Sequence, residues 1–204
     1  MKVLYYSLVV VIIDQISKLL IKGFNIPFLK VRHSGLKINQ SIKIIDDFFK
    51  ITHVENYGLA FGIDFGRNLK VALTLITIFA ALLILFYLYV SRQKAFQIRF
   101  AIALILGGAV GNIIDRTFYG IFYNYAPLFH GRVIDFIHID IFDYNLFGKT
   151  YESLPIFNIA DLAVFIGLLI LLFYSIKSKY TKADDDESND RLTLEEKIID
   201  SSIN

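Results

Sequence analysis

The chain has 204 residues, of which 55% are hydrophobic and 20% are charged. Soluble domains hold about 45–50% apolar and about 25% charged residues, so this composition indicates lipid as the solvent for much of the chain. The formal net charge of +2 provides no basic field for nucleic acid, and the absence of cysteine excludes disulfides, thiolate metal sites and a cysteine nucleophile. The length fits one membrane bundle with a small appendage.

Four apolar segments can cross a bilayer, which requires about 20 apolar residues each. The first segment carries Asp14 and Lys18 and lacks a small-x-small cleavage site, which favours a retained helix over a removed signal peptide. The chain is therefore expected to be mainly α-helical, with residues 1–176 forming one membrane domain. We place the spans at about 3–21, 69–90, 97–117 and 157–176, and the outer loops at about 22–68 and 118–156.

Positive charge sets the expected orientation. The short loop 91–99 holds Arg92, Lys94 and Arg99, and further lysines follow the fourth span. Because Lys and Arg are enriched on the cytoplasmic side, we expect both termini to be cytoplasmic. The tail 177–204 includes an acidic run at 184–187, which is typical of a solvated, disordered segment without chemistry of its own.

The two outer loops have different compositions. In the first, residues 42–45 and 48–54 are rich in Ile, Phe, Thr and Val, which predicts short strands and a small extracytoplasmic β-sheet cradle. The second loop is strongly aromatic, and aromatic side chains favour the level of the lipid headgroups. We expect these loops to form a cradle and a lid at the outer face.

Carboxylates near the outer edge of the spans are the candidate chemical groups. Asp115 lies sixteen residues above Arg99, and Asp161 lies sixteen residues above Lys177. At about 1.5 Å per residue, both carboxylates are about 24 Å above the inner boundary, which predicts that they lie at equal depth. Asn112 and Asn158 each precede one of these Asp residues by three positions and share its helix face. Asp135 lies in an apolar stretch of the second loop, which can return to the bundle.

Two interpretations fit these residues alone. The first is a structural polar network that joins helices, with Asp115 paired to neighbouring Arg116, because ionisable groups in a membrane face a partner or a cavity. The second is a carboxylate pair that shares one proton, in which one partner activates water and the other polarises a scissile carbonyl. A proton or solute carrier and an assembly protein are the competing classes.

Other hydrolytic chemistries are not supported by the residues present. The four histidines, at 33, 53, 130 and 138, form no His-x-x-x-His or His-Glu-x-x-His pattern, and no Gly-x-Ser-x-Gly elbow occurs. Ser17 and Lys18 are adjacent, so their side chains diverge on a helix. We therefore expect carboxylates alone to activate water, without a metal or cofactor.

Five motifs in chain order resemble the lipoprotein signal peptidases, also called signal peptidase II. They are residues 14–18 (DQISK), 56–62 (NYGLAFG), 107–116 (GGAVGNIIDR), 133–136 (VIDF) and 157–161 (FNIAD). The resemblance implies an aspartic endopeptidase of the bacterial inner membrane, with its active site near the outer face. Such enzymes remove the signal peptide of a prolipoprotein before its diacylglyceryl-modified cysteine, while the acyl chains remain in membrane lipid.

The resemblance also implies roles for single residues. The catalytic pair would be Asp135 and Asp161, whereas equal depth alone would pair Asp115 with Asp161. Arg116 and Asn56 would hold the substrate backbone. The supporting residues would be Asn112 and Asn158, which position the pair, Asp115, which orients Arg116, and Asp14, which is structural.

One departure from the family pattern concerns the second outer loop. Twenty residues separate Asp115 from Asp135, which resembles an insertion of about ten residues over much of 121–130. The motif resumes intact after Gly131, so the insertion affects the path of the loop more than the site.

Overall fold

The computed structural model describes residues 2–57, 66–140, 144–146, 149–151, 154–178 and 180. Four of its helices are long and apolar enough to cross a membrane: Leu4–Lys22, Leu69–Gln93, Phe96–Phe122 and Ile159–Ser178. These helices and several small antiparallel sheets confirm the predicted fold class. The acidic run of the tail and motif positions 58–62 lie outside the described residues.

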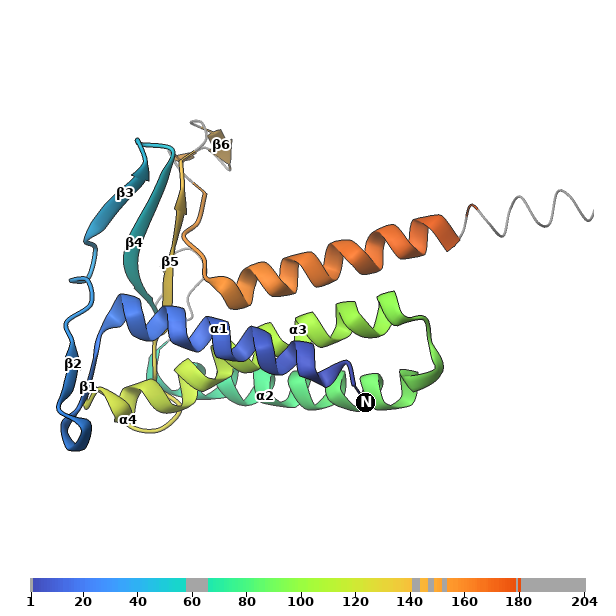
Figure 1. The fold of residues 1–204 in the computed structure, drawn as a ribbon, viewed down its shortest axis with the longest axis horizontal. Helices are drawn as coiled ribbons and strands as arrows, with labels where there is room; N and C mark the ends of the chain where they lie inside the picture. The colour runs from blue at the N-terminus through green and yellow to red at the C-terminus, as the bar shows by residue number, and fades with distance from the viewer. Residues whose placement is uncertain are drawn as a thin grey trace, which may run out of the picture.

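Three helices form the body of the bundle in Figure 1. They are α1 (Leu4–Lys22), α2 (Gly66–Val90) and α3 (Phe96–Ile114), with a 3₁₀ turn η3 (Ser91–Gln93) between the last two. The fourth helix, Ile159–Ser178, is drawn in orange and starts beside the sheet, and its far end diverges from the other three.

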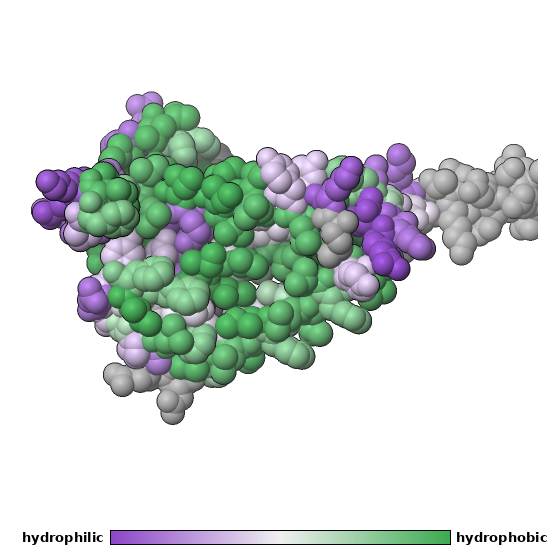
Figure 2. All heavy atoms as spheres, turned by 60° about the horizontal axis from the view of Figure 1, so that its bottom comes forward, coloured by the Kyte–Doolittle hydropathy of each residue, from purple (hydrophilic) through white to green (hydrophobic). Residues whose placement is uncertain are grey.

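The outer surface of the bundle is apolar, as lipid requires. Phe79 on α2 and Phe173 on the fourth helix are 62% and 65% exposed, although both are large and hydrophobic. Figure 2 shows a broad hydrophobic belt between hydrophilic residues at the two ends of the molecule. A continuous apolar surface of this kind is stable only where lipid covers it.

Small residues on α3 bring its neighbours close. A Cβ at Gly107 would lie 2.8 Å from the carbonyl oxygen of Ser7 on α1, and one at Gly108 would lie 2.2 Å from that of Ala160 on the fourth helix. At Gly111 a Cβ would lie 2.6 Å from Oδ2 of Asp14. Glycine therefore allows α3 to touch both neighbours at once.

The strands form three small antiparallel sheets at one end of the bundle (Figure 1). One is the hairpin β1 (Phe24–Ile26) and β2 (Val31–His33), and another is the hairpin β6 (Tyr144–Leu146) and β7 (Lys149–Tyr151). The third has the order β3 (Ser41–Ile45), β4 (Phe49–Asn56) and β5 (Val133–Ile139). The strands predicted in the first outer loop are confirmed, and β5 joins them from the second outer loop.

The third span is longer than the sequence predicts. Beyond Ile114 the chain continues through a π-helical turn η4 (Asp115–Tyr119) and a short α4 (Gly120–Phe122), so the helical segment ends at Phe122 instead of about residue 117. At Gly120 a Cβ would lie 2.7 Å from the carbonyl oxygen of Ala126, so glycine permits the chain to fold back there. Wide π turns are frequent at functional sites, and this one carries Asp115 and Arg116.

Candidate active site

Asp161 is held at the start of the fourth helix by a reciprocal cap. The backbone N–H of Asp161 donates to Oδ1 of Asn158 at 3.0 Å, and the backbone N–H of Asn158 donates to Oδ2 of Asp161 at 3.2 Å. This is the geometry of a capping box, in which the N-cap and N3 side chains satisfy each other's backbone donors. The spacing of three residues in the sequence therefore fixes the Asp161 carboxylate at the helix N-terminus.

Asp135 reaches the same place from the sheet. It lies on β5, is 3% exposed, and pairs across the sheet with Val54 of β4. The side-chain amide of Asn56 donates to its Oδ2 at 2.9 Å, which is a diagonal contact on one face of the strand pair. The opposite oxygen, Oδ1, accepts a hydrogen bond of 2.7 Å from Nδ2 of Asn158.

Two asparagines connect the Asp135 and Asp161 carboxylates. Nδ2 of Asn158 also donates to Oδ1 of Asn112 at 3.1 Å, and Nδ2 of Asn112 donates to Oδ1 of Asp161 at 2.8 Å. Asn158 is fully buried and Asn112 is 8% exposed. The network therefore places Asp135 and Asp161 on either side of Asn158, each with both oxygens oriented by hydrogen bonds.

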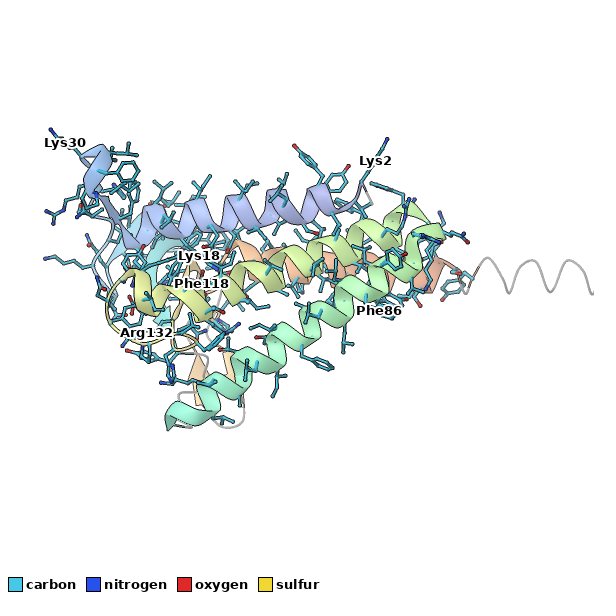
Figure 3. The ribbon with its side chains drawn as sticks, turned by 90° about the horizontal axis from the view of Figure 1, so that it is seen from below. Lys2, Lys18, Lys30, Phe86, Phe118 and Arg132 are labelled. Atoms are coloured by element: carbon cyan, nitrogen blue, oxygen red, sulfur yellow. The ribbon has the colours of Figure 1, made fainter. Side chains whose placement is uncertain are left out.

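A buried ion cluster lies beneath this network. The ammonium of Lys18 lies 2.8 Å from Oδ2 of Asp14, 2.8 Å from Oδ2 of Asp115, and 2.9 Å from Oδ1 of Asn112. All three charged side chains are 0% exposed. Figure 3 shows Lys18 on the inner side of α1, whereas Phe86 on α2 points away from the bundle. Since the three ammonium protons meet three acceptors, the charge of Lys18 is fully satisfied.

Asp14 also supports the fourth helix directly. Its Oδ1 accepts a hydrogen bond of 3.0 Å from the backbone N–H of Ala160, in the first turn of that helix. A negative charge at this position is favourable because the first N–H groups of a helix lack intrahelical partners. Asp14 thus joins α1, Lys18 and the helix that carries Asp161.

The partners of Asp115 differ from the Arg116 pairing that the structural-network interpretation included. Its Oδ1 accepts a 2.8 Å hydrogen bond from Gln15, and its Oδ2 contacts Lys18 and, at 3.3 Å, the backbone N–H of Ile134 on β5. Arg116 shares only the longer-range electrostatic field of Asp115, and the same holds for its relation to Asp135 and Asp161. Asp115 therefore pairs with Lys18 of α1 and not with the residue next to it, because adjacent side chains on a helix diverge.

The contacts of Asp115 and Asp161 also differ from the direct pair that equal depth alone suggests. Asp161 meets Asn112, one helical turn before Asp115, while Asp115 belongs to the Lys18 cluster. Sequence reasoning gave no role to Lys18 or Gln15. The signal for Lys18 was present, because Asp14 and Lys18 have the i, i+4 spacing of a helical ion pair.

Burial perturbs the acidity of Asp135. Removal from water raises the pKa of the Asp135 carboxyl to about 7, the hydrogen bond from Asn56 opposes that rise, and the negative charge of Asp161 adds to it. A carboxyl with this pKa is populated in both protonation states near neutral pH. Within the described residues, no group of three or more His, Cys, Asp or Glu side chains is arranged to hold a metal ion.

The chain is similar to known signal peptidases. The family model of signal peptidase (SPase) II matches residues 6–177. A lipoprotein signal peptidase of Chlorobium phaeobacteroides is 36% identical over 168 residues, covering 82% of this chain and 86% of that protein. One of Clostridium tetani is 38% identical over 142 residues, covering 70% and 78%.

Solved structures show the same architecture. A bacterial membrane enzyme solved by the in meso method at 1.9 Å resolution has a TM-score of 0.61 and 29% identity, and the match covers 86% of this chain and 93% of that one. A second, at 2.3 Å resolution, has a TM-score of 0.59 and 30% identity, with coverage of 87% and 89%. The family model, which matches most of the chain, and the identity to lipoprotein signal peptidases show that this protein belongs to the signal peptidase II family.

Proposed function

We propose that this protein is an intramembrane aspartic endopeptidase that removes the signal peptide of a diacylglyceryl-modified prolipoprotein, before the lipidated cysteine. Asp135 and Asp161 are the catalytic pair. The observation that carries the proposal is the bridge of Asn158, whose amide donates to Asp135 while its own cap holds Asp161. A buried carboxyl (Asp135) and a partly exposed one (Asp161) that share one hydrogen-bond network can act as the acid and base of an aspartic protease.

The chemistry follows from the different environments of the two carboxyls. Asp135, with its raised pKa, holds the proton and donates it to the oxygen of the scissile carbonyl. Asp161 accepts a proton from water as the water oxygen bonds to the carbonyl carbon. When the carbon–nitrogen bond breaks, Asp161 returns that proton to the leaving amine and Asp135 recovers its own from the hydroxyl.

The surrounding residues have binding and supporting roles in this proposal. Asn56 and Arg116 hold the substrate backbone, which is supported by the hydrogen bond of Asn56 to Asp135 and by the electrostatic interaction of Arg116 with both catalytic carboxylates. Asn112 and Asn158 set the directions of the carboxylates. Asp14 and Asp115 support them from below through Lys18. No cofactor enters the mechanism.

The orientation in the membrane is part of the proposal. The site is at the end of the bundle that carries the sheets, and the loop with Arg92, Lys94 and Arg99 is at the other end. Because basic loops favour the cytoplasm, the sheet end faces outward from a bacterial inner membrane, with both termini inside. A site at the edge of the apolar belt allows the acyl chains of the substrate to remain in lipid during cleavage.

Cleavage of a lipidated precursor by the purified protein in detergent micelles tests the proposal. Asp135→Asn and Asp161→Asn keep the side-chain shape but remove the proton chemistry, so each should reduce single-turnover cleavage by at least about 10²–10⁴-fold while leaving lipopeptide binding intact. Asp115→Asn should instead weaken folding or binding. If Asp135→Asn cuts normally and Asp115→Asn binds without cutting, the pair is Asp115 and Asp161, and the assignment is wrong.

A further inference from the structure

The inserted part of the second outer loop packs against a group of charged residues next to the active site. Glu55 on β4 pairs with Lys22 at the end of α1, and its Oε2 accepts a 2.7 Å ion-pair contact from Arg132, just before β5. The side chains of Lys22 and Glu55 are 8% and 6% exposed. In Figure 3, Arg132 lies at the opposite end of the bundle from Lys2.

Three tyrosines enclose these charges. The guanidinium of Arg132 lies 4.3 Å from the ring centre of Tyr57 and 4.7 Å from that of Tyr125. The ammonium of Lys22 lies 4.5 Å from the ring centre of Tyr123 and 5.2 Å from that of Tyr125. Two cations share one carboxylate, so the group has an excess positive charge, and the faces of aromatic rings stabilise such a charge.

Tyr123 and Tyr125 come from the insertion and are held firmly by it. The hydroxyl of Tyr123 donates to the carbonyl oxygen of Gly23 at 2.8 Å, and the hydroxyl of Tyr125 accepts from the backbone N–H of Arg132 at 2.8 Å. The insertion closes where the N–H of Gly131 donates to the carbonyl oxygen of Arg116 at 2.8 Å. The inserted loop therefore joins α1, the π turn and the start of β5.

The charged group is one residue away from the hydrogen bond that orients Asp135. Glu55 directly precedes Asn56, and Arg132 directly precedes Val133, which is the cross-strand partner of Asn56. A shift of Glu55 against Arg132 therefore changes how β4 meets β5 at the position where Asn56 donates to Asp135. Misplacement of a reacting group by about 1 Å can cost about 10²-fold in rate.

We infer that Glu55, which forms ion pairs with Lys22 and Arg132, is a positioning residue that holds Asn56 against the catalytic Asp135. The six residues of this charged and aromatic group are Lys22, Glu55, Tyr57, Tyr123, Tyr125 and Arg132. Its role rests on the proposed function of the Asp135–Asp161 site. The insertion supplies Tyr123 and Tyr125, so in this chain the loop supports the site as well as covering it.

Cleavage kinetics of Glu55→Gln test the inference. The substitution keeps the shape but leaves Lys22 and Arg132 without their carboxylate, so kcat should fall about tenfold or more while KM stays within about twofold. Here kcat is expressed per folded enzyme, counted by titration with a lipopeptide inhibitor, because a merely structural defect lowers the amount of folded enzyme and leaves kcat per folded molecule unchanged. The matched control is Asp47→Asn, which removes the carboxylate of an exposed ion pair on the same sheet and should leave both constants unchanged.

Tyr125→Leu provides a second, independent measurement if Glu55→Gln does not fold. It removes the shared aromatic face and the acceptor for the Arg132 N–H, so kcat should fall again at constant KM. Phe122→Leu, at a 67% exposed aromatic position at the start of the insertion, is its control. Wild-type kcat in both folded variants would overturn the inference, whereas failure of the wild-type enzyme to cleave would overturn the proposed function itself.

Discussion

Replacement of Lys18 by methionine tests the buried ion cluster most directly. Methionine is an unbranched chain of similar length that removes the ammonium and keeps most of the packing. Lys18 has no exposed surface and its three protons contact Asp14, Asp115 and Asn112 at 2.8–2.9 Å. Without Lys18, two fully buried carboxylates face each other across one site with no cation between them.

The expected loss of stability follows from this geometry. Removal of one partner from a buried ion pair costs about 3–5 kcal/mol, because the remaining charge is desolvated and unpaired. Four hydrogen bonds to the carboxylates persist, from Ala160 and Gln15 to Asp14 and from Gln15 and Ile134 to Asp115. Because these hydrogen bonds remain, we expect the loss of stability to stay within about 3–5 kcal/mol even though Lys18 pairs with two carboxylates. A loss of this size is a large part of the about 5–15 kcal/mol typical of a folded protein.

Equilibrium unfolding in detergent micelles measures the effect, with tyrosine fluorescence as the signal because the chain contains 12 Tyr and no Trp. A second substitution provides the internal check. Asp115→Asn in the Lys18→Met background removes one of the two unpaired charges and should restore part of the lost stability. The reasoning is refuted if Lys18→Met unfolds with wild-type stability. It is also refuted if Asp115→Asn destabilises the Lys18→Met protein as much as it destabilises the wild type.

Three further predictions concern packing, acidity and orientation. Gly108→Ala should strongly reduce the folded fraction in micelles, because its Cβ would lie 2.2 Å from a backbone oxygen of the fourth helix; a wild-type unfolding midpoint would contradict this. The value of kcat/KM should fall as the pH rises through about 7, because Asp135 must carry a proton to act as the acid; activity that is flat from pH 6 to about 9 would contradict the assignment. A cysteine at Asn39 should react with an impermeant thiol reagent in intact cells and one at Ser188 should not; the reverse labelling would invert the proposed orientation.

The sequence predicts the four spans and the strands β3 and β4 because local composition is enough to indicate them. Apolar runs of about 20 residues have few alternatives to a membrane span, and runs of β-branched residues between glycines favour strands. The candidate carboxylates were also visible, since an ionisable residue in an apolar segment is rare enough to stand out. These signals are local, and each can be read without knowledge of what the segment contacts.

The relative positions of the carboxylates depend on contacts that no local signal provides. Counting residues from the boundary charges placed Asp115 level with Asp161, yet Asp161 meets Asn112 instead. Counting residues estimates depth without helix tilt, and equal depth does not determine which side chains form a hydrogen bond. The path of Asp135 is set by pairing between β4 and β5, whose residues are about eighty positions apart in the chain.

The central asparagine shows why the residue types of this site are so restricted. Oδ1 of Asn158 must accept from Asp161 N–H to cap the fourth helix, while both protons of its Nδ2 are used, one by Asp135 and one by Asn112. Serine or aspartate also caps helices, but serine is too short to supply two further donors, and aspartate would add a third negative charge between two carboxylates. Only an amide on a short side chain provides a neutral acceptor and two donors at this point. The side chain of Asn158 therefore caps the helix that carries Asp161 and also orients the carboxylate of Asp135 on its strand. The geometry of the pair thus depends on how the helix begins.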